Sequence, residues 1–173
     1  MNKIIVGVVG FFAGILVCAI AGYCIVLSGF IPARQDVPSS QLETWAAHQS
    51  LRATIQRETA DLKCPLQADE ENLKAGAKVY AENCSGCHGA PASPTPPFAA
   101  AYSPAAPLFA NGDTVTDDPE SKIYWKIDHG VRFTGMPSFN KMLNEKQMWQ
   151  VTLFLKNVDK LPTSVNATWK AMK

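Results

Sequence analysis

Residues 84–88 read Cys84-Ser85-Gly86-Cys87-His88, so two thiols stand three positions apart and a histidine follows the second directly. This C-x-x-C-H spacing is the attachment signature of c-type haem. Two thiols at this spacing can add across the two vinyl groups of one porphyrin, and the next residue brings an imidazole to the iron. The sequence therefore predicts one covalent haem c, held by Cys84 and Cys87, with His88 as an axial iron ligand.

Other uses of a C-x-x-C pair fit this sequence poorly. A thioredoxin-like redox site needs a βαβ context, which the flanking residues lack. A zinc site would need a second Cys/His pair, and the chain has none. The three remaining cysteines give an odd total of five, which argues against a disulfide framework. They are Cys18, Cys24 and Cys64.

The second axial ligand is expected downstream, in the sequence Gly135-Met136-Pro137. A thioether sulfur is a soft ligand for haem iron and raises its reduction potential. Glycine and proline on either side favour a tight loop that can aim one side chain inward. Met136 is the preferred sixth ligand. The alternatives are Met142, Met148, His129 and an open iron.

Helix signals surround the motif. Three helix starts are marked by acidic or capping residues: Asp69-Glu70-Glu71 before Cys84, Asp118-Pro119-Glu120, and Asn144 with Gln147. Apart from the short and ambiguous stretch 114–116, no segment alternates as a strand would. The sequence therefore predicts an all-α haem domain at residues 69–162, followed by a C-terminal tail at 163–173.

The N-terminal region predicts a membrane anchor. Residues 4–27 carry no charge and would form about 36 Å of helix, enough to cross a hydrocarbon core of about 30 Å. Cleavage after Ala19-Ile20-Ala21 would leave an apolar stub, so we expect an uncleaved, single-pass anchor at residues 1–31. Lys3 favours a cytoplasmic N-terminus, which places the haem domain on the periplasmic side of the inner membrane.

Residues 32–68 are expected to join the anchor to the haem domain. Pro32 and Pro38 bracket a short linker. Ser40, followed by Glu43, reads as a capping box that opens a helix over about 41–63. This helix serves either as a spacer or as a contact for a partner.

Charge is distributed unevenly along the chain. The net charge of +1 gives no indication of nucleic-acid binding. Residues 35–121 carry a net charge of −7, whereas residues 122–173 carry +6. This asymmetry can steer a charged partner, and scattered surface charge is the alternative interpretation.

The combined motifs resemble the class I cytochrome c family, in particular its membrane-anchored bacterial monohaem members. The resemblance covers about residues 72–162. The resemblance rests on four motifs. They are Gly76-x-x-x-Tyr80-x-x-x-Cys84-x-x-Cys87-His88, then Ile123-Tyr124-Trp125 before His129-Gly130, then Gly135-Met136-Pro137-Ser138-Phe139, and finally residues 149–155. It implies a helical fold in which the helix before the motif crosses the C-terminal helix at Gly76. It also implies Met136 as the distal ligand and a proline carbonyl, for which Pro107 is the candidate, hydrogen-bonded to His88.

These patterns predict a one-electron carrier in a bacterial respiratory or related electron-transfer chain, with redox proteins as partners. We expect no catalytic residues, no small-molecule substrate and no nucleic acid. The expected docking cations are Lys126, Arg132, Lys141 and Lys146. The alternatives are a dedicated haem c subunit of a larger membrane oxidoreductase complex, or a gas sensor or peroxidase with an open sixth position.

Overall fold

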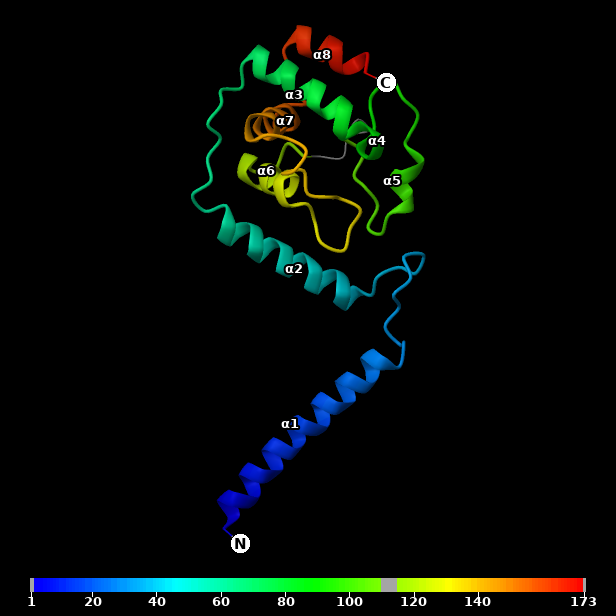
Figure 1. The fold of residues 1–173 in the computed structure, drawn as a ribbon, viewed down its shortest axis with the longest axis vertical. Coiled ribbons are helices and arrows are strands. Elements are labelled where there is room, and N and C mark those ends of the chain that lie inside the picture. The colour runs from blue at the N-terminus through cyan, green and yellow to red at the C-terminus, as the bar shows by residue number, and fades with distance from the viewer. Residues whose placement is uncertain (1, 110–114, 173) are drawn as a thin grey trace. The chain divides into compact units, whose positions relative to one another are not determined.

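The computed structural model describes residues 2–109 and 115–172 and divides the chain into two units, 1–38 and 39–173. Every regular element in the described ranges is a helix, which confirms the all-α prediction (Figure 1). The helices are α1 (Lys3–Leu27), α2 (Gln41–Glu58), α3 (Glu70–Asn83), α4 (Ser85–His88), α5 (Pro97–Ala101), α6 (Glu120–His129), α7 (Glu145–Lys156) and α8 (Thr163–Lys170).

Helix α1 makes up most of the first unit. It has no buried residue and is long and apolar enough to cross a membrane. Asn2 caps its first turn, since the side chain accepts a hydrogen bond from the Ile4 backbone N–H at 3.5 Å. Its length and composition fit the expected membrane anchor.

Helices α3 and α7 form the central crossing of the second unit. A Cβ atom at Gly76 would lie 2.6 Å from the Gln150 carbonyl carbon and 2.8 Å from Phe154 Cβ. Only glycine allows the two backbones to approach so closely, which outweighs its cost of about 1 kcal/mol in a helix. The close crossing expected at Gly76 is therefore confirmed.

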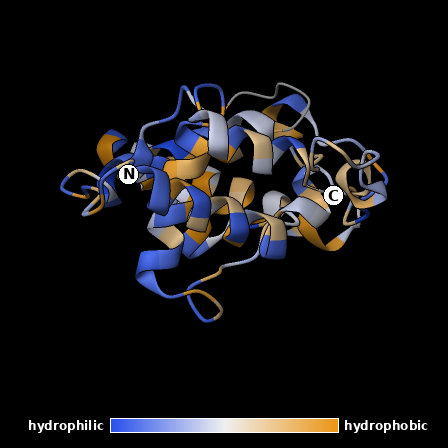
Figure 2. Cartoon of the chain, turned by 90° about the horizontal axis from the view of Figure 1, so that it is seen from above, coloured by the Kyte–Doolittle hydropathy of each residue, from blue (hydrophilic) through white to orange (hydrophobic). Residues whose placement is uncertain are grey.

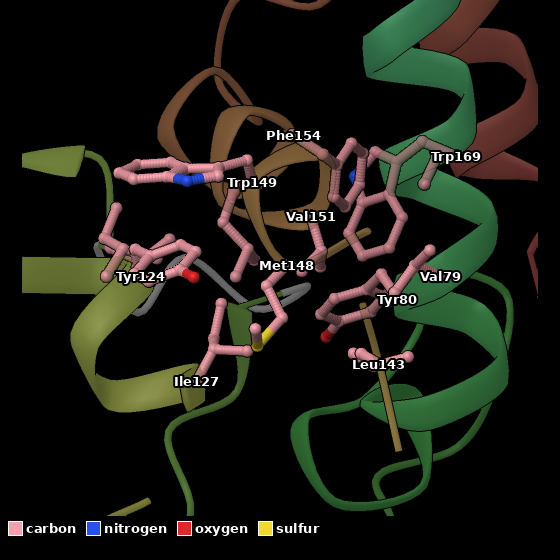
Figure 3. Packing of buried hydrophobic residues seen from close by; sticks show 14 residues of the cluster. Val79, Tyr80, Tyr124, Ile127, Leu143, Met148, Trp149, Val151, Phe154 and Trp169 are labelled. Atoms are coloured by element: carbon pink, nitrogen blue, oxygen red, sulfur yellow. The ribbon is translucent and has the colours of Figure 1, made fainter. Parts of the chain in front are cut away.

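Aromatic side chains fill the core around this crossing. Tyr124 of α6 stacks on Trp149 of α7 with ring centroids 4.0 Å apart, and Tyr80 of α3 lies beside Phe154 (Figure 3). Helices α3, α6 and α7 each combine buried hydrophobic residues with more exposed polar residues, as expected when one face of a helix is packed (Figure 2). Full burial of one such large side chain stabilises the fold by about 1.5–3 kcal/mol.

The C-terminal residues differ from the expected tail. Helix α8 buries Val165 and Trp169, and the Trp169 ring meets Tyr80 and Phe154 edge-on at 5.3 Å in both cases. These two residues stand four positions apart and so share one helix face. Residues 163–170 thus complete the helical core, and Pro162 precedes a new helix.

Helix α2 also packs on the haem domain. It begins at Ser40, whose side chain accepts a hydrogen bond from the Glu43 N–H as expected, but it ends at Glu58, earlier than residue 63. Ile55 is buried, and Glu58 accepts a hydrogen bond of 2.9 Å from the Trp125 indole N–H of α6. The first half of α2 remains exposed, including Leu42 and Trp45.

Candidate haem site

One helical turn brings the three motif residues together. Helix α3 closes at Cys84, whose backbone N–H donates to the Tyr80 carbonyl at 2.8 Å. The chain continues directly into α4, where the His88 N–H donates to the Cys84 carbonyl at 2.9 Å. Because positions i, i+3 and i+4 share a helix face, the turn places both thiols and the imidazole on the same side.

The residue after the motif is tied back to α3. Gly89 has a positive φ of 80°, which ends the turn in a conformation that favours glycine. The buried Tyr80 hydroxyl donates a hydrogen bond of 2.8 Å to the Gly89 carbonyl. Burial raises the pKa of Tyr80, which therefore stays protonated and keeps this donor. Tyr80 thus fixes the end of the motif against the core.

The His88 ring is held by the loop that follows the motif. Its Nδ1 atom lies 2.8 Å from the Pro107 carbonyl oxygen. A carbonyl can only accept a hydrogen bond, so Nδ1 carries the proton and Nε2 presents its lone pair. A hydrogen bond at the other ring nitrogen is the usual support of a metal-bound histidine. The hydrogen bond expected from His88 to Pro107 is confirmed.

Phe109 supports the same ring from its face. The Phe109 and His88 rings stack with centroids 4.7 Å apart and planes only 7° from parallel. Sequence reasoning missed Phe109, because it lies in an irregular segment where no periodicity distinguishes an inward side chain. Together, Pro107 and Phe109 restrict both the direction and the plane of the imidazole.

The protonation states of the motif suit a covalent haem. Cys84 and Cys87 are free thiols. Burial, with a smaller contribution from Cys87, raises the pKa of Cys84 to about 12 and keeps it protonated. Burial also lowers the pKa of His88 despite the hydrogen bond to Pro107, which favours the neutral imidazole that binds a metal. Two free thiols and one neutral, oriented imidazole on one helix face fit a c-type haem.

Met136 lies in a loop closed by its own hydrogen bonds. The Val131 N–H donates to the Met136 carbonyl at 3.1 Å, which joins the two ends of the loop. The Thr134 hydroxyl donates to the Val131 carbonyl at 2.7 Å and accepts from the Met136 N–H at 3.1 Å. A Cβ at Gly135 would meet the Tyr102 ring, with Cγ 2.6 Å away, so the ring packs directly on this backbone.

The same loop is fastened to the end of α6. The Ser138 hydroxyl donates to the Asp128 carbonyl at 2.6 Å, and the Phe139 N–H donates to the Ile127 carbonyl at 3.0 Å. At Gly130, φ is 67° and a Cβ would lie 2.8 Å from the Met136 carbonyl oxygen. The backbone on both sides of Met136 is therefore fixed before any ligand binds.

The rival sixth ligands differ from Met136 in burial or in their contacts. Met142 is exposed, and Met148 is buried in the core on α7. His129 stacks on Trp125 at 4.9 Å, and its Nδ1 donates to the Trp125 carbonyl at 3.2 Å. Met136 is half-buried and packs, with Cys84 and Phe109, on the same core cluster that contains Met148. The structure thus brings Met136 and the haem motif to one core.

A helical domain with this motif turn, oriented histidine and methionine loop is a cytochrome c domain. Residues 71–155 match the family described as "Cytochrome C oxidase, cbb3-type, subunit III". This region of the chain belongs to the cytochrome c family, as the sequence resemblance indicated, and its cofactor is covalent haem c with iron.

Two curated relatives carry the name "Cbb3-type cytochrome c oxidase subunit FixP". The protein from Sinorhizobium medicae is 29% identical over 105 residues, which are 56% of this chain and 34% of the relative. The protein from Rhizobium etli is 31% identical over 101 residues, 54% of this chain and 32% of the relative. The matched region therefore spans about a third of each relative's length.

A solved structure is also similar. A chain of the reducing HAO-like protein complex of Kuenenia stuttgartiensis aligns with a TM-score of 0.47 and 26% identity. The alignment covers 57% of this chain and 48% of that chain.

Proposed function

We propose that the chain is a membrane-anchored one-electron carrier whose haem c is bound by Cys84 and Cys87, with His88 and Met136 as axial ligands. The observation that carries this proposal is the His88 imidazole, whose Nδ1 is held by Pro107 at 2.8 Å and whose Nε2 is left for iron. When bound, the haem supplies reversible one-electron reduction of its iron.

The chain's own residues have a positioning role in this function. Pro107 and Phe109 hold the His88 ring, and the closed loop around Thr134 holds Met136. Two protein ligands on the iron leave no position for a substrate, so we propose electron transfer without catalysis. Rigid ligands also keep structural change between the two oxidation states small.

The domain order that accompanies this function is an anchor at 1–31, a linker and helix at 32–68, and the haem domain from residue 69. We propose that α1 crosses the inner membrane once, with its N-terminus in the cytoplasm and the haem domain in the periplasm. The uncharged stretch 4–27 of α1 and the position of Lys3 support this topology.

A second candidate is a dedicated subunit of a cbb3-type oxidase or related complex. The names of the two relatives favour it, as does the exposed first half of α2. Leu42 is 73% exposed and Trp45 is 61% exposed, which leaves two large apolar side chains for a partner subunit. Purification of the full chain in mild detergent separates the candidates, because a subunit brings oxidase subunits with it and a free carrier does not.

Potentiometric titration of the purified full chain tests the proposed function. We expect a single reversible one-electron wave and a low-spin haem spectrum in both oxidation states. The double variant Cys84→Ala/Cys87→Ala is the control, since it should lose covalently bound haem. A high-spin spectrum in the wild-type protein would favour a gas sensor or peroxidase and would contradict the carrier.

A further inference from the structure

Phe133 combines backbone strain with exposure. It is the one non-glycine residue with positive φ in the described ranges, at 61°, and its side chain is 92% exposed. Left-handed backbone is unfavourable for an aromatic residue, and asparagine or glycine would adopt it more readily. The ring therefore gains no packing within the chain to offset the strained backbone.

The loop that fixes Met136 also fixes Phe133. The Thr134 backbone N–H donates to the Val131 carbonyl at 3.2 Å, and the Thr134 hydroxyl donates to the same carbonyl at 2.7 Å. These bonds span Phe133 and hold its backbone in the left-handed conformation. One short loop thus carries both the proposed iron ligand, Met136, and the exposed aromatic ring of Phe133, three positions before it.

The charge of this segment is uniformly positive. Residues 130–144 join the end of α6 to the start of α7. They contain Arg132 and Lys141 and no carboxylate. Both cations are exposed and make no ion pair with any residue in 2–109 or 115–172. Lys126, an expected docking cation, differs: its Nζ pairs with Asp118 at 2.9 Å. The free positive charge therefore lies on the methionine loop segment rather than on α6.

We propose that Phe133 is the apolar centre of a docking surface for a redox protein, with Arg132 and Lys141 as its cationic rim. The fitting partner carries an apolar patch ringed by carboxylates, because its surface must complement both the ring and the cations. Exposed aromatic side chains with flanking charge are typical anchors of such interfaces. This inference rests on the proposed electron-carrier function.

The experiment compares wild type and Phe133→Asn as full-length holoproteins in detergent. The protein probe is a small copper protein with an acidic patch, and the small-ion probe is hexacyanoferrate, which has no apolar face. We expect Phe133→Asn to slow electron transfer with the copper protein by about tenfold, the effect of losing one interface anchor. Its rate with hexacyanoferrate should stay unchanged. Its urea unfolding midpoint should rise, because asparagine accepts the left-handed backbone.

Arg132→Gln is the matched charge variant. We expect it to slow electron transfer with both probes at low salt. It should also weaken the dependence of the copper-protein rate on ionic strength. An unchanged copper-protein rate in Phe133→Asn would overturn the docking surface. So would loss of stability together with a changed haem spectrum, because Phe133 would then be structural. Self-association that Phe133→Asn abolishes would identify a second copy as the occupant and also overturn it.

Failure of the proposed function is distinguishable from failure of the docking surface. Without a reversible one-electron wave in the wild-type protein, the carrier itself fails. With that wave and the hexacyanoferrate rate intact, only the copper-protein comparison decides the role of Phe133.

Discussion

The Thr134 hydroxyl bridges the two sides of the methionine loop, accepting from the Met136 N–H at 3.1 Å and donating to the Val131 carbonyl at 2.7 Å. A single hydrogen bond of this kind contributes about 1 kcal/mol to stability. We expect this hydroxyl to affect ligation as well as folding, because it holds the Met136 backbone N–H beside the atom from which the Met136 side chain starts. Thr134 is thus a positioning residue for the proposed sixth ligand.

Replacement of Thr134 by valine should loosen Met136. Valine keeps the shape but removes both hydrogen bonds, so we expect loop stability to fall by about 1–2 kcal/mol. The methionine–iron charge-transfer band should weaken, and carbon monoxide should bind the reduced protein measurably faster. Thr134→Ser keeps the hydroxyl and should behave as wild type. If valine and serine variants shared one spectrum, the bridge would have no role in ligation.

Replacement of Gly76 by alanine should separate α3 from α7. The added Cβ would lie 2.8 Å from Phe154 Cβ and 2.6 Å from the Gln150 carbonyl carbon. Because the Gln150 carbonyl belongs to the backbone of α7, it cannot move aside as a flexible side chain would. Overpacking of this kind costs about 1–3 kcal/mol or more, measurable by urea denaturation. Gly86→Ala is the control, since its Cβ would meet nothing within 4 Å. Equal stability of the two variants would argue against the crossing.

Replacement of Trp169 by alanine tests whether α8 belongs to the core. Trp169 is 6% exposed and touches Tyr80 and Phe154, so we expect a loss of about 3–5 kcal/mol in the free energy of unfolding. Trp45→Ala, at a 61% exposed position, should change it by less than about 0.5 kcal/mol. A tail at 163–173 would instead give two small and similar effects.

Asp118 should contribute a pH-dependent stability. Burial opposes ionisation of its carboxyl, but hydrogen bonds from Lys122 and Lys126 outweigh this and lower its pKa. A lowered folded-state pKa means that the contribution is present above the unfolded-state pKa of about 3.9 and is lost as pH falls through the folded-state pKa. Asp118→Asn should therefore destabilise the protein by about 1 kcal/mol at pH 7.

Urea midpoints at pH 7 and pH 2.5 provide the measurement. The difference between wild type and Asp118→Asn should shrink at the lower pH, because the Asp118 carboxyl becomes protonated as pH falls through its lowered folded-state pKa. Asp117→Asn serves as the neighbouring control, since Asp117 is exposed and pairs with no described residue. A difference that is independent of pH would show that the ion pairs are not its source.

Local signals predicted much of the fold because they act over a few residues. Asn144 is the N-cap of α7 as expected, and the structure adds that Gln147 at N3 completes a capping box with both reciprocal hydrogen bonds. Gly76 indicated a close crossing because a glycine inside a helix needs a compensating contact. Helix α8 was missed because Pro162 read as an end, although the spacing of Val165 and Trp169 was a helical signal.

The haem site likewise contains residues that local sequence predicts and residues that only the tertiary structure reveals. Covalent haem attachment requires the spacing of Cys84, Cys87 and His88, so the sequence alone was enough to predict the haem site. Phe109 and Tyr102 reach the site from the irregular, proline-rich segment, where only tertiary structure decides which side chain points inward. The role of Met136 as an axial ligand stays a prediction.

The most direct test of a haem ligated by His88 and Met136 is carbon monoxide binding to the reduced, full-length protein, measured optically beside Met136→Ala. We expect a low-spin wild-type protein with a methionine–iron charge-transfer band and no response to carbon monoxide. In Met136→Ala the band should vanish and carbon monoxide should bind readily. Rapid binding to the wild-type protein, or a band that survives in Met136→Ala, would contradict a haem closed by His88 and Met136.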